Sequence, residues 1–351
     1  MKLTLNRSPR AFRTAPTAPT ARTVTLGALV VSAALLAACG GGSQVQTFNA
    51  SRVIAFGDES SLINPDGTKY SVNAVIMDTS VTPAVPTTAV DCAANPIWAQ
   101  VVATAYGLVF PQCNPKAVAA PVSRIYAVNG ATVADLSAQV DLQVANGGFV
   151  ETDLVTVLVG ANDVVAQFAQ YPTVGEAQLA DALDAAGKAL AAQVNRVAGL
   201  GAKVLISTIP DMGLTPYAGS RATGTVNTNS AVLTRLSLRF NDALLANLEN
   251  NGHKIGLVQL DEYLQAVERA RANGTGTAFF NTTLAACLPT AALPACTTQT
   301  LGTDASDIPT PTVVNTASGA TWLWADNRHL SAGGQASLGS LAVTRARNNP
   351  F

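Results

Sequence analysis

The stretch that decides the fold is Val53-Ile54-Ala55-Phe56-Gly57-Asp58-Glu59-Ser60-Ser61-Leu62. Its first four residues form an apolar run with the length and composition of a buried strand. Gly57 and the small and acidic residues after it are typical of a tight turn at the carboxyl end of that strand. Ligands and reactive groups gather at this edge of open α/β sheets. A serine in this turn is therefore a candidate nucleophile, provided that a base lies close enough to activate it.

Strands and helices alternate along the chain after this stretch. We expect further strands at 124–128, 154–159, 203–209 and 254–260, and helices at 133–144, 174–198, 230–250 and after Ser331. Such alternation predicts an α/β fold with a mostly parallel five-stranded sheet, covered by helices on both faces and joined by right-handed crossovers. Two stretches of weak periodicity, near 63–121 and 273–320, are interpreted as insertions into one domain that spans 51–351.

The first 38 residues are typical of an export signal. A basic segment precedes an apolar run, residues 24–38, that is too short to span a bilayer comfortably. Leu36-Ala37-Ala38-Cys39-Gly40 is similar to a bacterial lipobox, so we expect cleavage before Cys39 and lipidation of its thiol. Residues 39–50, with their run of glycines, are then a flexible tether. These features predict an exported lipoprotein of the cell envelope, at the outer membrane and facing the periplasm or the surface.

Removal of the signal leaves an acidic protein. The chain has 21 Lys and Arg residues and 22 Asp and Glu residues, and the five charged residues before Cys39 are all basic. Subtracting those five leaves 16 basic against 22 acidic residues, a formal net charge of about −6. A nucleic-acid partner is therefore not expected.

Four cysteines remain after Cys39, and they fall into two local groups. An even number of cysteines in an exported chain suggests disulfides, and the grouping predicts the pairs Cys92–Cys113 and Cys287–Cys296. A metal site is not expected, because the spacings are not Cys-x-x-Cys and no histidine lies close to either group.

The chain has only two histidines, and they differ in position relative to the strands. His253 enters a strand at its amino end, which is the wrong edge for a site in this architecture. His329 follows Asp326 by three residues, so the carboxylate can fold back onto one ring nitrogen. The other nitrogen is then left to accept a hydroxyl proton. Asp326 and His329 are therefore a candidate orienting acid and general base.

Two further polar features follow strands and should lie at the same edge as the first turn. Gly130 offers a backbone N–H, and Asn162 offers a side-chain amide. Donors of these two kinds stabilise the oxyanion that forms during acyl transfer, and each typically contributes about 2.7–4 kcal/mol. Both residues are therefore candidate oxyanion-hole donors.

Taken in chain order, these features resemble the four sequence blocks of the SGNH (GDSL-type) hydrolases, in their bacterial lipase and esterase branch. The blocks are Gly57-Asp58-Glu59-Ser60, Asn129-Gly130, Gly160-Ala161-Asn162-Asp163 and Asp326-x-x-His329. The resemblance implies a flavodoxin-like three-layer α/β/α sandwich and a serine esterase that needs no metal or cofactor. It also implies a Ser–His–Asp relay, with the Ser60 N–H, the Gly130 N–H and the Asn162 amide in the oxyanion hole.

One residue departs from the family pattern. That pattern is Gly-Asp-Ser-Leu, and an ungapped match puts Glu59 on the nucleophile position. Three interpretations follow: Ser60 is the nucleophile on a turn that is one residue longer, Ser61 takes that role, or Glu59 marks a degenerate site. The first predicts an exported, lipid-anchored esterase or lipase in which Ser60, His329 and Asp326 hydrolyse small-molecule, lipid or glycan esters. The last predicts an envelope lipoprotein that binds an acylated glycan or lipid. No protein partner is predicted.

Overall fold

The computed structural model describes residues 48–220, 228–276, 278–301, 317–348 and 351 of the 351-residue chain. The predicted signal peptide, Cys39 and the tether up to residue 47 lie outside these residues. Phe48 falls within the predicted tether, but its ring packs edge-on against Tyr106 and Phe351, and Ala50 is buried. The packed part of the chain therefore begins a few residues before position 51.

A five-stranded parallel sheet in the order β4-β1-β5-β6-β7 forms the centre of the fold. Its strands are β1 (Arg52–Gly57), β4 (Arg124–Ile125), β5 (Asp153–Leu158), β6 (Lys203–Ser207) and β7 (Ile255–Val258). β1 and β5 pair in register along six residues, and nearly all of their side chains are buried. The strand order reverses at β1, so the carboxyl end of β1 lies at the topological switch point where sites form in such sheets.

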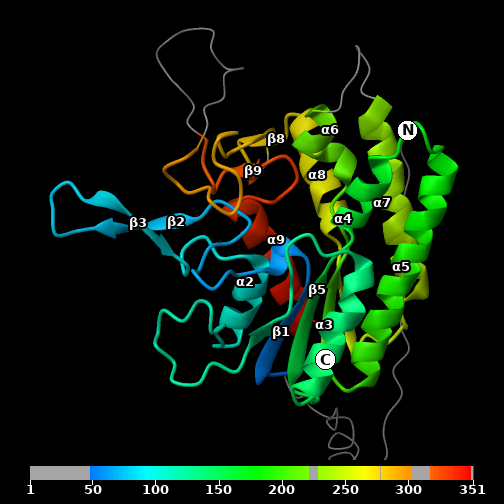
Figure 1. Ribbon diagram of the computed structural model, residues 1–351, viewed down its shortest axis with the longest axis horizontal. Helices are drawn as coiled ribbons and strands as arrows, with labels where there is room; N and C mark the ends of the chain where they lie inside the picture. Colours follow the sequence, from blue (N-terminus) through cyan, green and yellow to red (C-terminus); the bar gives the residue numbers. More distant parts are fainter. Residues whose placement is uncertain (1–47, 221–227, 277, 302–316, 349–350) are drawn as a thin grey trace, which may run out of the picture. The chain divides into compact units, whose positions relative to one another are not determined.

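Helices cover both faces of the sheet (Figure 1). One face is covered by α3 (Val133–Ala145), α5 (Glu176–Gly199) and α7 (Thr228–Asn247), and the other by α2 (Trp98–Ala105) and α9 (Ala332–Asn348). The other elements include η1 (Glu59–Ser61), α4 (Ala161–Phe168), η2 (Met212–Leu214), α6 (Pro216–Ser220), α8 (Leu260–Ala272), β8 (Asn281–Ala285) and β9 (Trp322–Trp324). The predicted α/β/α sandwich with a five-stranded parallel sheet is confirmed.

Residues 63–121 differ from the predicted insertion. They contain the antiparallel strands β2 (Ala74–Asp78) and β3 (Val85–Asp91), which project from the body of the fold (Figure 1). They also contain α2, which belongs to the sandwich itself. Trp98 and Val102 of α2 are fully buried, because the apolar side of this helix packs against both the sheet and α9.

Both predicted disulfides are present. Cys92–Cys113 closes a loop of which α2 is part, and Cys287–Cys296 closes a shorter loop near the carboxyl edge of the sheet. Stable disulfides form in oxidising compartments, so the presence of these two disulfides agrees with export from the cytoplasm. Closing loops of these sizes contributes on the order of 2–4 kcal/mol each to the free energy of unfolding.

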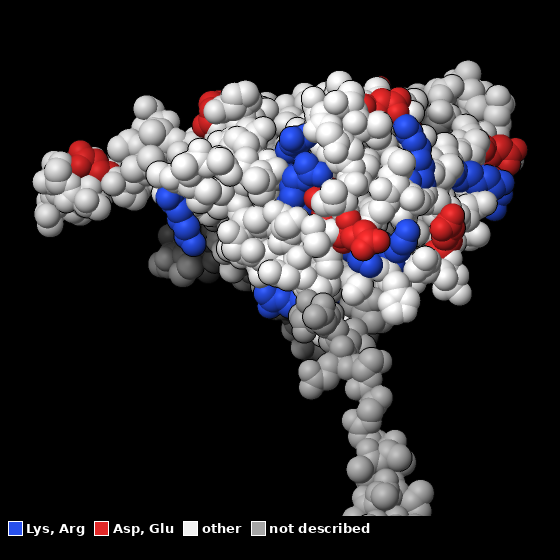
Figure 2. Space-filling view, turned by 90° about the horizontal axis from the view of Figure 1, so that it is seen from below, with Lys and Arg blue, Asp and Glu red and all other residues white. Residues whose placement is uncertain are grey.

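The distribution of charge on the surface and the hydropathy of the helices add two observations. In Figure 2, Lys and Arg side chains on the visible face are interspersed with Asp and Glu among many uncharged residues. Within the part of the chain that the structure describes, no helix combines the length and the apolar character needed to cross a bilayer.

Gly57 ends β1 in a conformation that only glycine adopts readily. Its φ is +123°, and a Cβ added there would lie 1.9 Å from the carbonyl oxygen of Leu158. Gln139 of α3 fixes this residue further, because its amide donates to the Gly57 carbonyl at 2.9 Å and its carbonyl accepts from the Gly57 N–H at 2.8 Å. The turn that follows β1 therefore starts from a rigid point.

Gly57→Ala is expected to lower the free energy of unfolding by about 3 kcal/mol or more, because it combines backbone strain with a clash against a neighbouring strand. Gly107→Ala is the matched control, since Gly107 also has a positive φ, +71°, but no heavy atom within 4 Å of an added Cβ. It should lose about 1–2 kcal/mol. Urea denaturation measures both values, and equal losses would contradict the role assigned to the contact with Leu158.

Candidate active site

The turn after β1 is a single turn of 3₁₀ helix, η1, capped by Asp58. The Asp58 carboxylate accepts a hydrogen bond from the Ser60 N–H at 2.9 Å. A 3₁₀ helix has three residues per turn, so successive side chains point about 120° apart. Glu59, Ser60 and Ser61 therefore face three different directions, and only one of them can face His329.

The residue that faces His329 is Glu59. Its Oε1 atom lies 2.9 Å from His329 Nε2 and 3.6 Å from Arg328 Nη2. Its Oε2 atom accepts hydrogen bonds from the Gly130 N–H at 2.8 Å and from the Asn162 side-chain amide at 3.1 Å. The side chain is only 3% exposed. One carboxylate thus contacts both the candidate base and the two candidate oxyanion donors.

Asp326 and His329 are arranged as the spacing between them predicts. Asp326 Oδ2 lies 2.8 Å from His329 Nδ1, and Asp326 Oδ1 accepts the backbone N–H of His329 at 2.8 Å. The carboxylate therefore holds the ring by one nitrogen and directs the other toward Glu59. His253 lies in the turn before β7, at the amino edge of the sheet, away from this group.

The two serines considered as nucleophiles are directed elsewhere. Ser61 is fully buried, and its Oγ accepts a hydrogen bond from the indole N–H of Trp98 at 3.0 Å. The Ser60 N–H, expected in the oxyanion hole, donates instead to the Asp58 carboxylate at 2.9 Å. The phase of the 3₁₀ turn thus gives Glu59 the place that the serine relay requires for Ser60 or Ser61.

The two oxyanion donors are held by the loops after β4 and β5. Gly130 has a φ of +76°, which turns its N–H toward Glu59. Asn162, in the first turn of α4, also donates to the carbonyl of Ala131 at 3.0 Å, so its amide bridges the Gly130 loop and Glu59. Asp163 accepts the Val133 N–H at 3.1 Å, which joins the two loops again. Both donors are therefore fixed before any ligand binds.

The contacts set the charges of the site. Burial alone would raise the pKa of Glu59, but the hydrogen bond and charge of His329 outweigh it and lower that pKa to about 2. Burial would lower the pKa of His329, but the hydrogen bonds that its ring donates to Asp326 and Glu59 raise it to about 9. At neutral pH, Glu59 and His329 therefore form an ion pair. Burial, together with the nearby Glu59 charge, raises the pKa of Asp58 to about 7.

The ion pair predicts how stability changes with pH. His329 contributes stability that is complete below pH 6.5 and is lost as the pH rises through about 9. The contribution of Glu59 is complete above pH 4.5 and is lost as the pH falls through about 2. That of Asp58 is complete below pH 3.8 and is lost as the pH rises through about 7. From these three groups the melting temperature should be highest near pH 4 and should decline toward pH 9.

In Glu59→Gln this decline should be shallower, because one of the two carboxylates that keep His329 protonated is gone. Glu151→Gln removes an exposed carboxylate and serves as the control, with the wild-type profile expected. Thermal unfolding between pH 5 and pH 9 measures the difference. The same decline in wild type and Glu59→Gln would contradict the ion pair.

A cavity of about 610 Å³ opens beside His329. Asp326, Arg328 and His329 form one wall, and Tyr70 and Tyr217 also line it. A group of apolar lining residues comes mostly from the loop closed by the Cys287–Cys296 disulfide. It consists of Ala285, Cys287, Leu288, Pro289, Ala291, Ala292 and Leu293. The cavity is therefore suited to a mostly uncharged ligand next to His329.

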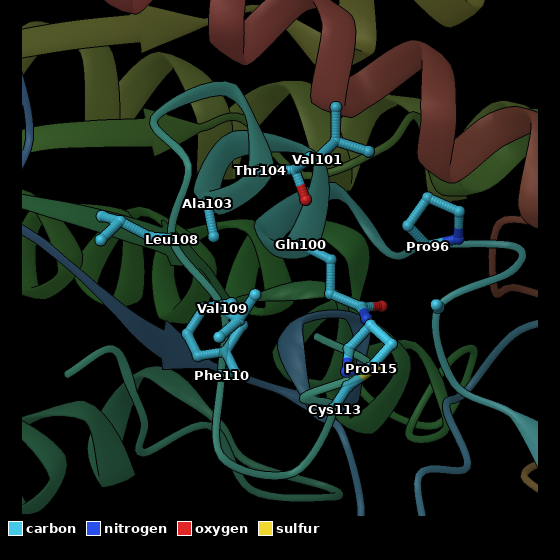
Figure 3. Close-up of a pocket in the computed structure, with 11 residues that line it drawn as sticks. Pro96, Gln100, Val101, Ala103, Thr104, Leu108, Val109, Phe110, Cys113 and Pro115 are labelled. Carbon is cyan, nitrogen blue, oxygen red and sulfur yellow. The ribbon is translucent and has the colours of Figure 1, made fainter. Parts of the chain in front are cut away.

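A second, smaller cavity of about 320 Å³ lies at α2 and the loop after it (Figure 3). Its lining includes Val101, Leu108, Phe110 and Pro115, and it contains no residue of the Glu59 site. No lining side chain is ionisable, since Cys113 is held in a disulfide. Acid, base or nucleophilic chemistry is therefore confined to the first cavity of the two.

Sequence reasoning missed Tyr70, Tyr217 and Arg328 as parts of the site. Arg328 could have been found from its place between Asp326 and His329. Tyr70 lies in the stretch that was interpreted as an insertion, and its ring centroid is 6.1 Å from that of His329. Among the described residues, no group of histidine, cysteine and acidic side chains is arranged to hold a metal ion.

The parallel sheet, the Asp326–His329 pair and the two fixed donors at its carboxyl edge together define an α/β/α hydrolase site of the ester-hydrolase kind. The family model for GDSL-like lipases and acylhydrolases matches residues 96–341. The chain therefore belongs to this SGNH family of carboxylic ester hydrolases. The matched region contains Gly130, Asn162, Asp326 and His329, but it begins after the turn that carries Glu59.

Several solved structures are similar to the chain at low sequence identity. The extracellular lipase of Streptomyces rimosus is 17% identical, with 85% of this chain and 100% of that chain covered at a TM-score of 0.41. Phospholipase A1 of Streptomyces albidoflavus is 15% identical, with 85% of this chain and 99% of that chain covered at a TM-score of 0.41. A catalytic mutant of an acetylxylan esterase of Geobacillus stearothermophilus is 14% identical, with 86% of this chain and 96% of that chain covered at a TM-score of 0.42. No match was found among curated proteins. The family assignment rests on the family model.

Proposed function

We propose that this chain is a hydrolase that carries its covalent intermediate as an ester of Glu59 instead of an ester of serine. The observation that carries the proposal is the position of the two Glu59 oxygens. Oε2 accepts from Gly130 and Asn162, and Oε1 lies 2.9 Å from His329 Nε2. If Oε1 became bonded to a substrate carbon, the remaining carbonyl oxygen would already lie in the oxyanion hole.

The family's groups would then hydrolyse this ester. His329, oriented by Asp326, would take a proton from water, and the water oxygen would attack the carboxyl carbon of Glu59. The negative charge that develops on Oε2 would be stabilised by the Gly130 N–H and the Asn162 amide. The alcohol would leave with a proton from His329, and the free Glu59 would return its own proton to His329. This half of the reaction is carboxylic ester hydrolysis, the chemistry of the family.

The same contacts oppose the serine relay with Ser60 or Ser61. A carboxylate in the oxyanion hole repels the charge that develops on a substrate carbonyl. His329, paired with Glu59, is protonated and cannot accept the proton of a hydroxyl. The Ser61 hydroxyl is bound by the Trp98 indole N–H, and the Ser60 N–H donates to Asp58. An acyl-serine intermediate would require the whole turn to rearrange.

Two covalent probes test the proposal, with modified residues located by peptide mass spectrometry. An alkyl fluorophosphonate, which reacts with activated serines, should leave no adduct on the wild-type protein. A small primary alkyl bromide should modify Glu59, and Glu59→Gln should abolish that adduct. A fluorophosphonate adduct on Ser60 or Ser61 would refute the proposal and would restore the serine relay.

A second candidate function is binding without turnover. It is favoured by the resemblance between Glu59 and a bound carboxylate product, with one oxygen in the oxyanion hole and the other on the base. An acylated glycan or lipid would then occupy the 610 Å³ cavity unchanged. This function predicts that neither probe reacts, while a short-chain ester still binds in equilibrium dialysis.

The proposal includes export and a lipid anchor at Cys39, in the outer membrane. It is supported by the lipobox-like sequence and by the two disulfides. Cys39→Ala should move the protein from the membrane fraction to the soluble fraction, because one residue carries the whole anchor. Immunoblotting of the two fractions measures this, and membrane retention of the variant would contradict the anchor.

A further inference from the structure

The burial of Glu59 limits what can reach it. The side chain is 3% exposed, and Oε2 is turned toward Gly130 and Asn162. Oε1 is the oxygen next to His329 and Arg328, both of which line the 610 Å³ cavity. Glu59 itself does not line the cavity, so a substrate carbon would reach Oε1 from there by passing His329 and Arg328.

The occupied oxyanion hole limits the kind of carbon. Attack on a carbonyl carbon would place a new oxyanion in the site, but Oε2 already holds both donors. Attack on a saturated carbon needs no donor from the oxyanion hole, because the carbon exchanges one bond for another and the negative charge departs on the leaving group. Saturated carbon is therefore the better electrophile for this carboxylate, and the carbon must carry a leaving group.

The proton on His329 limits the leaving group. His329 lies between two carboxylates, with Asp326 Oδ2 at 2.8 Å and Glu59 Oε1 at 2.9 Å, so the resting site stores one proton there. An alkoxide leaving group would take this proton and would leave a neutral imidazole, the form needed for the second half of the reaction. A halide ion would leave without the proton, and His329 would remain unable to act as a base.

The cavity supplies a further donor and an apolar wall. The Tyr70 ring lies 6.1 Å from the His329 ring, and burial raises the pKa of its hydroxyl, so that it stays a neutral donor. The wall formed by Leu288, Pro289 and Leu293 favours an uncharged group on the substrate. Arg328, beside Glu59 and in the same cavity, disfavours a cationic one.

We propose that the substrate class is a terminal epoxide, which the site converts to a 1,2-diol. This inference rests on the proposed function, in which Glu59 is the nucleophile. Glu59 Oε1 forms a bond to the terminal ring carbon, the carbon–oxygen bond of the ring breaks, and the alkoxide takes the His329 proton. Water, activated by the now neutral His329, hydrolyses the glutamyl ester as described above. The diol leaves, and Glu59 and His329 become an ion pair again. The net reaction is epoxide plus water to diol, with no other reactant.

Styrene oxide is a suitable probe, with diol formation followed by chromatography. The wild-type protein should form diol over many turnovers, and Glu59→Gln should lose this activity by a factor of about 10³ or more. Tyr70→Phe should lower kcat more than it raises KM, since the donor acts on the developing alkoxide. Glu151→Gln should behave as the wild type.

The possible outcomes distinguish a failure of the epoxide proposal from a failure of the proposal that Glu59 is the nucleophile. Diol formation that depends on Glu59 supports both. If a primary alkyl bromide modifies Glu59 but styrene oxide is neither bound covalently nor hydrolysed, the epoxide class is wrong while the carboxylate nucleophile stands. If neither electrophile modifies Glu59, the proposed function itself fails. Diol formation that is unchanged in Glu59→Gln also overturns the inference.

Discussion

Glu59→Ser is expected to turn the protein into a serine esterase. The substitution puts a hydroxyl beside His329 Nε2 and removes the carboxylate from the oxyanion hole. It also frees the Gly130 N–H and the Asn162 amide for a substrate carbonyl. His329 then keeps only Asp326 as a carboxylate partner, so its pKa should fall toward the range of a general base. All the groups of the family's relay would be in place.

The expected gain is a rise in kcat/KM for p-nitrophenyl acetate of about 10²–10⁴-fold over Glu59→Ala. Glu59→Ala is the matched control, because it frees the same donors but offers no nucleophile. Glu59→Ser should also react with a fluorophosphonate at residue 59. Equal rates for the two variants would show that His329 and the donors are not arranged for acyl transfer.

Asn162→Ala is expected to make the covalent intermediate visible. The Asn162 amide donates to Glu59 Oε2, where charge develops only while the glutamyl ester is being hydrolysed. Loss of one such donor slows hydrolysis by about 10²–10³-fold. Formation of the ester should change much less, because attack on a saturated carbon places no new charge on that oxygen. The ester should therefore accumulate.

Intact-mass measurement during turnover of styrene oxide follows this accumulation. Asn162→Ala should gain the mass of one substrate molecule, and proteolysis should locate it on Glu59. Asn250→Ala, on the exposed turn before β7, is the control and should stay unmodified at steady state. If Asn162→Ala loses turnover without gaining mass, the amide has no role in breaking an ester of Glu59.

Most of the fold could be predicted from sequence because its signals are local. The apolar runs of β1, β5 and β6 and the periodic α3, α5 and α7 lie close to their expected ranges. α2 was interpreted as part of an insertion, because its eight residues are flanked by a hairpin and an irregular loop. Its burial depends on α9, more than 200 residues later, and local pattern cannot report such a contact.

The sequence predicted which residues gather at the site and which turn carries the nucleophile position, but it did not decide which side chain of that turn faces His329. Gly130, Asn162, Asp326 and His329 each follow a strand or share a short spacing, so the topology brings them to one edge. The side chain that faces His329 is decided by the phase of η1, and a shift of one residue in a 3₁₀ turn rotates the side chain by about 120°. Asp58 caps the turn and so sets that phase. The ungapped match with the family pattern puts Glu59 at the position that faces His329, but the sequence alone left Ser60 and Ser61 open as alternatives.

The central claim, that Glu59 carries a covalent ester, is tested most directly by a single turnover in ¹⁸O-labelled water with the protein in excess over styrene oxide. We predict that the label enters the Glu59 carboxylate, while the first diol released contains an unlabelled oxygen from Glu59. A labelled diol formed while Glu59 remains unlabelled would mean that water attacks the substrate directly, and it would contradict the account.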